Sequence, residues 1–118
     1  MEKTEWTTQL RRGILEYSIL LHMEKKQMYG YELISSLSKW NILATAEGTI
    51  YPLLRRLEKE HLITSNWEES VPGLPPRKYY RLTDEGTEFL SMMNIEWGNV
   101  TEAINHIRNE EETNGTVN

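Results

Sequence analysis

Two clusters of cationic residues have the types and spacing to bind a polyanion. Arg55, Arg56 and Lys59 fall within about one turn of each other if their segment is helical, and Arg77 and Lys78 follow further along the chain. Lysine and arginine neutralise phosphates, and the guanidinium group can also donate two hydrogen bonds to guanine. A fold that brought both clusters to one surface would therefore create a site for nucleic acid.

The overall charge argues against such a site, but the distribution of charge does not. The chain of 118 residues has a formal net charge of -5 and a pI near 5.2, whereas nucleic-acid-binding domains are typically basic. Residues 1–46 and 47–81 each contain six basic and five acidic residues, while residues 82–118 contain one and eight. The acidic excess is thus confined to the C-terminal third, which leaves room for a basic surface elsewhere.

The residues give little support to other kinds of chemistry. There is no cysteine, and the three histidines, His22, His61 and His106, lack the spacing of metal ligands. No nucleophile–base pair or phosphate-binding loop is visible. We therefore expect neither an enzyme nor a bound metal or cofactor.

The location of the protein is predicted from two absences. Charges at Lys3, Arg11, Arg12 and Glu16 interrupt the first thirty residues, which excludes a secretory signal. No segment reaches the roughly 18–20 uncharged apolar residues that cross a bilayer. A cytoplasmic protein without a membrane partner is expected.

Hydrophobic spacing predicts the helices that position the first cationic cluster. One helix is expected over residues 8–25, a second over 31–39 after a tight entry at Gly30, and a third over 47–60. Thr45 is expected to cap the third helix, because a threonine hydroxyl can accept a backbone N–H at that position. Pro52 is compatible with the third helix since it lies near its start.

The third helix is predicted to be two-faced. At about 100° per residue, one face is apolar and the opposite face is largely cationic. The apolar face contains Ile50, Leu53, Leu54 and Leu57, and the opposite face contains Gly48, Pro52, Arg55, Arg56 and Lys59.

The second cationic cluster is predicted to lie on a β-hairpin. Residues 62–68 (LITSNWE) and 77–82 (RKYYRL) have strand composition, and three prolines and a glycine separate them. Thr83, followed by Asp84 and Glu85, then caps a last helix that is expected to end near Arg108.

That last helix is predicted to form a dimer. Its apolar residues recur at alternating spacings of 3 and 4, the pattern of a coiled-coil seam. At about 1.5 Å per residue the helix would be roughly 38 Å long, too long for a domain of this size to cover. The expected seam is Leu90, Met93, Trp97, Val100, Ile104 and Ile107.

The order of these elements is that of a winged helix-turn-helix. The fold class is therefore mainly α with a small β-hairpin, and residues 1–118 form a single domain. Within it, residues 8–82 form the DNA-binding unit, 83–109 the dimerisation helix and 110–118 a disordered tail. The third helix of such a unit enters the major groove while the hairpin contacts the backbone. The expected contacts are Tyr29, Thr49, Tyr51, Arg55, Arg56, Lys59, Arg77 and Lys78.

Three segments resemble a known family. "MYGYELI", "EGTIYPLLRRLEKEHLI" and "PPRKYYRLTDEG" are similar to signature segments of the PadR family of bacterial transcription regulators. The resemblance implies a homodimeric winged-helix repressor that binds double-stranded operator DNA. The single helix after the hairpin is similar to the short subgroup that includes the multidrug-binding repressor LmrR. His61 stands where the family usually has glycine.

The subgroup resemblance also implies a ligand. Trp97 lies in the middle of the seam, and LmrR-like proteins use a matching tryptophan to sandwich planar aromatic molecules. A planar cation is the expected class, because Glu16 would add charge complementarity. The implied ligand residues are Leu10, Gly13, Glu16, Tyr17, Met93, Trp97 and Val100.

Two alternatives stay open. Trp97 can equally be ordinary packing in the dimer core. The winged helix can serve as a protein-interaction module without specific DNA binding, which the acidic C-terminal third and Glu58 and Glu60 favour.

Overall fold

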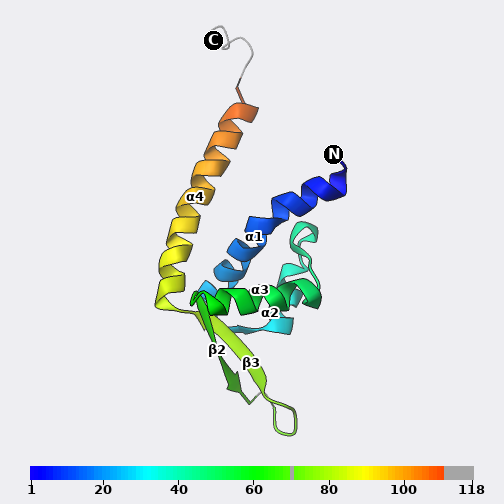
Figure 1. The fold of residues 1–118 in the computed structure, drawn as a ribbon, viewed down its shortest axis with the longest axis vertical. Helices are drawn as coiled ribbons and strands as arrows, with labels where there is room; N and C mark the ends of the chain where they lie inside the picture. The colour runs from blue at the N-terminus through cyan, green and yellow to red at the C-terminus, as the bar shows by residue number, and fades with distance from the viewer. Residues whose placement is uncertain (70, 111–118) are drawn as a thin grey trace.

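The computed structural model describes residues 1–69 and 71–110, and its helices and strands follow the predicted order (Figure 1). Apart from residue 110, the tail predicted to be disordered lies outside the described residues. The fold is mainly helical with a small antiparallel sheet and a long C-terminal helix, which confirms the predicted fold class. The elements are α1 (Lys3–Lys25), β1 (Met28–Tyr29), α2 (Gly30–Leu37), the 3-10 helix η1 (Asn41–Leu43), α3 (Glu47–Lys59), β2 (Ile63–Glu68), β3 (Arg77–Leu82) and α4 (Asp84–Arg108).

The sheet has one more strand than the sequence predicts. β2 and β3 form the expected antiparallel hairpin, in a register that pairs Ile63 with Leu82 and Glu68 with Arg77. The short strand β1 adds to the other edge of β3, where Tyr29 pairs with Tyr79. This strand anchors the start of α2 to the hairpin.

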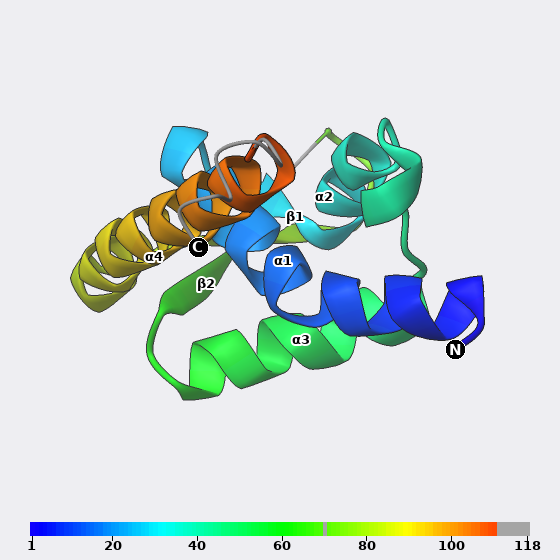
Figure 2. The ribbon, with the colours of Figure 1, turned by 90° about the horizontal axis from the view of Figure 1, so that it is seen from above.

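The hairpin and the two long helices lie on opposite sides of α3. In Figure 1 the β2–β3 hairpin projects from one side of α3, while α1 and α4 extend from the opposite side. Seen from above, α1 lies between α3 and α4 (Figure 2). The predicted DNA-binding surface and the predicted dimer helix are thereby held on opposite sides of the molecule.

The core is built from the apolar stripes of α1, α2, α3 and α4 and from residues of all three strands. Its apolar residues leave water almost completely, and each such burial stabilises the fold by about 1.5–3 kcal/mol. The side chains that are less than 2% exposed are Ile19, Leu20, Leu33, Leu37, Ile50, Leu54, Leu57, Ile63 and Leu90.

Helix starts differ from the prediction in two places. α1 begins at Lys3, five residues earlier than predicted, because no proline or glycine interrupts the helix there. Thr45 does not cap α3: the cap position is Ala46, which offers no side-chain hydrogen bond. The chain stays extended through Ala44 and Ala46, so the Thr45 hydroxyl lies one position too early to reach the first N–H groups.

The start of α4 is fixed by hydrogen bonds to the connection between α3 and β2. The Thr83 hydroxyl accepts the Gly86 N–H at 2.9 Å, as predicted for a cap, and also donates to the His61 carbonyl at 2.6 Å. The Thr83 N–H donates to the Leu62 carbonyl at 3.1 Å. A Cβ on Gly86 would lie 1.9 Å from that carbonyl oxygen, so only glycine allows this approach.

His61 follows the C-terminal cap of α3 and has a left-handed conformation, with φ of 64°. This conformation explains why the resemblance places glycine at this position, since a left-handed φ costs about 1–2 kcal/mol for a residue with a Cβ. The substitution therefore affects the end of the helix and leaves its outer face unchanged.

Candidate nucleic-acid interface

The outer face of α3 presents two cations that are free to bind a ligand. Arg55 and Lys59 are exposed, one turn apart, opposite the buried Ile50, Leu54 and Leu57. Among the residues that the structure describes, neither cation makes an ion pair. Neither charge is therefore engaged in an ion pair within the described chain, which leaves both side chains available to a polyanion.

Arg56 does not share this face. Its guanidinium group forms an ion pair with the Glu16 carboxylate of α1. The pairing follows from helical geometry, because consecutive residues point about 100° apart and Arg56 therefore faces α1 when Arg55 faces outward. The structure thus separates two arginines that the sequence analysis grouped together.

Arg77 and Lys78 are held at the loop end of the hairpin by aromatic and acidic neighbours. The Arg77 guanidinium lies 4.3 Å from the ring centre of Tyr29, whose ring meets Tyr79 edge to face at 5.5 Å. The Lys78 ammonium lies 3.9 Å from a Glu58 carboxylate oxygen. Both residues are half-buried, and their contacts pre-position the two cations at this end of the hairpin.

Tyr51 and Thr49, both expected to contact DNA, lie in different surroundings. The Tyr51 ring packs over the start of α2, where a Cβ on Gly30 would lie 2.5 Å from it. Burial, followed by the Glu47 charge, raises the pKa of Tyr51, so its hydroxyl stays neutral. Thr49 lies on the flank of α3 that faces α1.

A groove joins α2, α3 and the hairpin, and it contains a residue that the sequence analysis missed. Trp67 of β2 is 68% exposed and pairs in register with Lys78. The sequence does mark Trp67, as a single tryptophan in an otherwise polar strand. Only the strand pairing shows that it lies beside the cationic residues of the hairpin. The groove is lined by Tyr29, Gly30, Tyr51, Trp67, Arg77, Lys78 and Tyr80.

The predicted ligand residues gather in a second pocket, between α1 and α4. The rings of Tyr17 and Trp97 meet at a centroid distance of 6.0 Å, and the Tyr17 hydroxyl donates to Asn94 Oδ1 at 2.5 Å. The pocket has a volume of about 330 Å³. Its lining is Leu10, Gly13, Ile14, Tyr17, Met92, Met93, Glu96, Trp97 and Val100.

Glu16 is the one predicted ligand residue that does not line this pocket. It faces α3 because it pairs with Arg56, and the acid at the pocket is Glu96. Glu16 therefore does not adjoin the aromatic floor as predicted, and Glu96, which the sequence analysis did not select, lines the pocket instead.

Leu90, the first residue of the predicted seam on α4, is not exposed. Leu90 is 1% exposed and belongs to the core of its own chain, so it cannot contact a partner. Met93 is half-buried, and Trp97, Val100, Ile104 and Ile107 are 43–66% exposed. The uncovered apolar stripe thus occupies the second half of the helix.

The described residues also bear on metals and membranes. Across residues 1–69 and 71–110, no cluster of three or more histidine and acidic residues could hold a metal ion. In the same residues no helix combines the length and apolar character needed to span a bilayer.

Comparison with known proteins places the chain among bacterial regulators. The model of the transcriptional regulator PadR-like family matches residues 19–92. A PadR-like transcriptional regulator from Bacillus cereus is 39% identical, with a TM-score of 0.79 over 87% of this chain and 99% of that one. A Streptococcus transcriptional regulator is 38% identical, with a TM-score of 0.75 over 86% and 98%. An uncharacterized protein of Lysinibacillus sphaericus is 37% identical over 79% of this chain and 86% of its own length.

Proposed function

Because this chain belongs to the PadR-like family of transcriptional regulators, we propose that it is a dimeric repressor that binds double-stranded operator DNA through α3 and the hairpin. Family membership makes it a DNA-binding regulator and not an enzyme. The observation that carries the proposed interface is the exposure of unpaired Arg55 and Lys59 on the outer face of α3. Arg77 and Lys78 of the adjoining hairpin would neutralise phosphates beside the groove that α3 enters.

The exposed second half of α4 supports the proposed dimer. Apolar residues that continue for several turns without a covering element are typical of an interface. A symmetric pairing of two such helices would bury the stripe and place the two α3 helices for adjacent half-sites.

Removing the hairpin cations is expected to weaken binding to all DNA sequences. In Arg77→Ala combined with Lys78→Ala, the slope of log affinity against log salt should become shallower by about one unit per lost phosphate contact, counted in both protomers. Binding to labelled DNA from upstream of the protein's own gene, measured at several salt concentrations, checks this. Lys3→Ala combined with Arg108→Ala removes the same charge far from the hairpin and should keep the parent slope. A parent-like slope in the hairpin variant would mean that the hairpin makes no phosphate contact.

A ligand role for the α1–α4 pocket is the second part of the proposal. Tyr17 and Trp97 present aromatic faces and Glu96 supplies a negative charge, which together suit a planar aromatic cation. A ligand that separates α1 from α4 would shift the two α3 helices and release the operator, provided that it binds the free dimer more tightly than the DNA-bound dimer.

Replacing Trp97 with alanine is expected to weaken the binding of planar cationic dyes by about 0.5–2 kcal/mol, the usual size of a cation–π contact. Dye fluorescence anisotropy measures this after sedimentation has established that the variant assembles like the parent. Trp40→Ala removes another exposed tryptophan and should leave dye affinity unchanged. Glu96→Gln should also weaken dye binding, whereas Glu16→Gln should not. Equal affinity of Trp97→Ala and the parent would make Trp97 a packing residue.

A further inference from the structure

Trp67 is a large apolar side chain that the fold leaves at the surface beside the cations of the hairpin. It is 68% exposed, although tryptophan is highly buried on average. It pairs in register with Lys78 of β3, and both side chains line the groove that joins α2, α3 and the hairpin. No residue in the part of the chain that the structure describes accepts its indole N–H. The face and the polar edge of the ring are therefore both available to a ligand.

The face of the hairpin that carries Trp67 is turned toward α3. Side chains alternate between the two faces of a strand, so Ile63, Ser65 and Trp67 share one face of β2. Ile63 is buried in the core, and the Ser65 hydroxyl donates to Glu58 Oε2 of α3 at 2.6 Å. Trp67 comes two residues later, where the hairpin projects away from α3 (Figure 1). The ring thus lies just beyond the last contact that ties β2 to α3.

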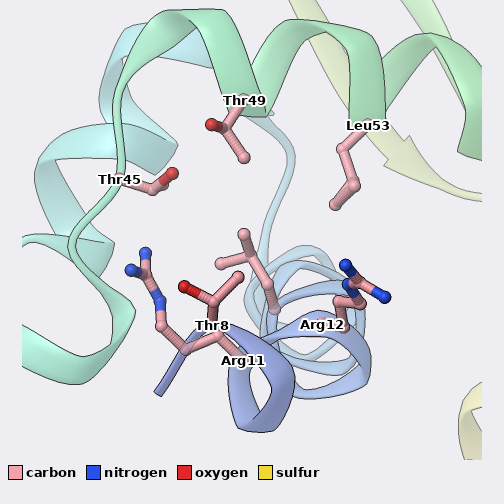
Figure 3. A pocket seen from close by; sticks show the side chains of 7 residues that line it. Thr8, Arg11, Arg12, Thr45, Thr49 and Leu53 are labelled. Carbon is pink, nitrogen blue, oxygen red and sulfur yellow. The ribbon is translucent and has the colours of Figure 1, made fainter. Parts of the chain in front are cut away.

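The opposite flank of α3 is occupied by another helix. Thr49 and Leu53 of α3 point across a hollow toward α1 (Figure 3). A duplex seated on the outer face of α3 therefore meets its second contact surface on the hairpin side, where Trp67 lies.

We propose that Trp67 packs its indole ring against a deoxyribose of the DNA strand whose phosphates Arg77 and Lys78 neutralise. This inference rests on the proposed function and adds an apolar contact to the charges of the hairpin. Sugars alternate with phosphates along a DNA strand, and directly paired residues of neighbouring strands have Cβ atoms about 4.5–5.5 Å apart. A side chain paired with a phosphate-binding lysine is therefore well placed to meet a sugar.

The chemistry of the indole suits this contact. Its flat face matches the C–H surface of the sugar, and its N–H can donate to an adjoining phosphate oxygen. DNA is favoured over a protein as the occupant because Trp67 shares its groove with Tyr51 of α3 and with both hairpin cations.

An apolar contact has a different signature from a phosphate contact. A neutral ring releases no counterions when it meets DNA, so its contribution to affinity does not weaken as salt rises. Trp67 and the hairpin cations can therefore be told apart by the salt dependence of binding.

The test is a salt series with Trp67→Ala on the same labelled DNA from upstream of the protein's own gene. Affinity should fall about ten-fold for each hairpin, which corresponds to covering about a quarter of the indole surface. The slope of log affinity against log salt should stay that of the parent. Trp67→Phe keeps a flat apolar ring and should lose less. Trp40→Ala removes a similarly exposed tryptophan beside η1 and should bind like the parent.

A second readout reports the contact without changing affinity. In protein labelled with 5-fluorotryptophan, the ¹⁹F resonance that is missing from Trp67→Phe should shift when DNA is added. The resonance that is missing from Trp40→Phe should stay in place. Urea unfolding of Trp67→Ala should match the parent, because an exposed side chain contributes little to folding.

The outcomes separate this inference from the proposed function. If the parent itself does not bind the DNA, the proposed function fails and the Trp67 contact fails with it. If the parent binds, then parent-like affinity of Trp67→Ala and an unmoved Trp67 resonance would overturn the contact alone. A slope as shallow as that of the Arg77 and Lys78 variant would also overturn it, since Trp67 would then act only by positioning the cations.

Discussion

Replacing Ile104 and Ile107 with aspartate is expected to convert the protein to a monomer and to abolish tight operator binding. Both side chains are exposed, at 49% and 66%, on the stripe of α4 that its own chain leaves uncovered. In a symmetric dimer the double substitution would bury four like charges at one contact, and each uncompensated buried charge costs several kcal/mol. Loss of the second half-site contact would lower operator affinity by about 10²–10⁴-fold.

Sedimentation at micromolar concentration measures the assembly, and titration of labelled operator DNA measures the affinity. The matched control is Ile95→Asp combined with Ser91→Asp, which adds the same charge to the same helix. Both control positions are exposed and lie about 160° around the helix from the stripe. A stripe variant that still sediments as a dimer would remove α4 from the interface.

Replacing Arg55 with alanine is expected to cost about 1–3 kcal/mol of operator affinity, the size of a bidentate contact to a base. Replacing Arg56 should instead leave operator affinity near that of the parent. Arg56 is paired with Glu16, and both side chains are partly exposed, at 51% and 25%. Because partly exposed pairs contribute only about 0–1 kcal/mol, Arg56→Ala should show a small loss of folding stability.

The two arginine variants control for each other, because each removes one guanidinium group from the same helix. Operator titrations give the affinities, and urea unfolding gives the free energy of unfolding. If Arg55 reads a base, a change of that base should reduce parent affinity but not that of Arg55→Ala. An equal loss of operator affinity in both variants would mean that the Arg56–Glu16 pair opens when DNA binds.

Local patterns predicted much of this fold. The 3.6-residue spacing located the core face of α3, and the Pro-rich segment between two strand-like segments located the hairpin. Thr83 was predicted as the cap of α4 because an N-cap depends only on the few residues that follow it. These features are decided within a few residues, so a single sequence contains the information.

Long-range placement was not available from the sequence. The Glu16–Arg56 pair depends on how α1 crosses α3, and neither helix's own pattern specifies that angle. Leu90 continues the apolar spacing of α4 without a break, yet it lies in the core because the first part of α4 packs on its own domain. β1 has two residues and therefore no periodicity to detect.

The contacts at Thr83 and Gly86 hold the start of α4 rigidly against the rest of its domain. Its hydrogen bonds to His61 and Leu62 tie the start of α4 to the end of α3, and the close approach at Gly86 leaves no room for sliding. Over the roughly 38 Å length of α4, a tilt of about 5° at these contacts displaces the far end by roughly 3 Å. In the proposed dimer, the rigid α4 helices therefore set the distance between the two α3 helices. A small change in the angle at which the two α4 helices cross would change this distance, and with it the half-site spacing that the dimer can bind.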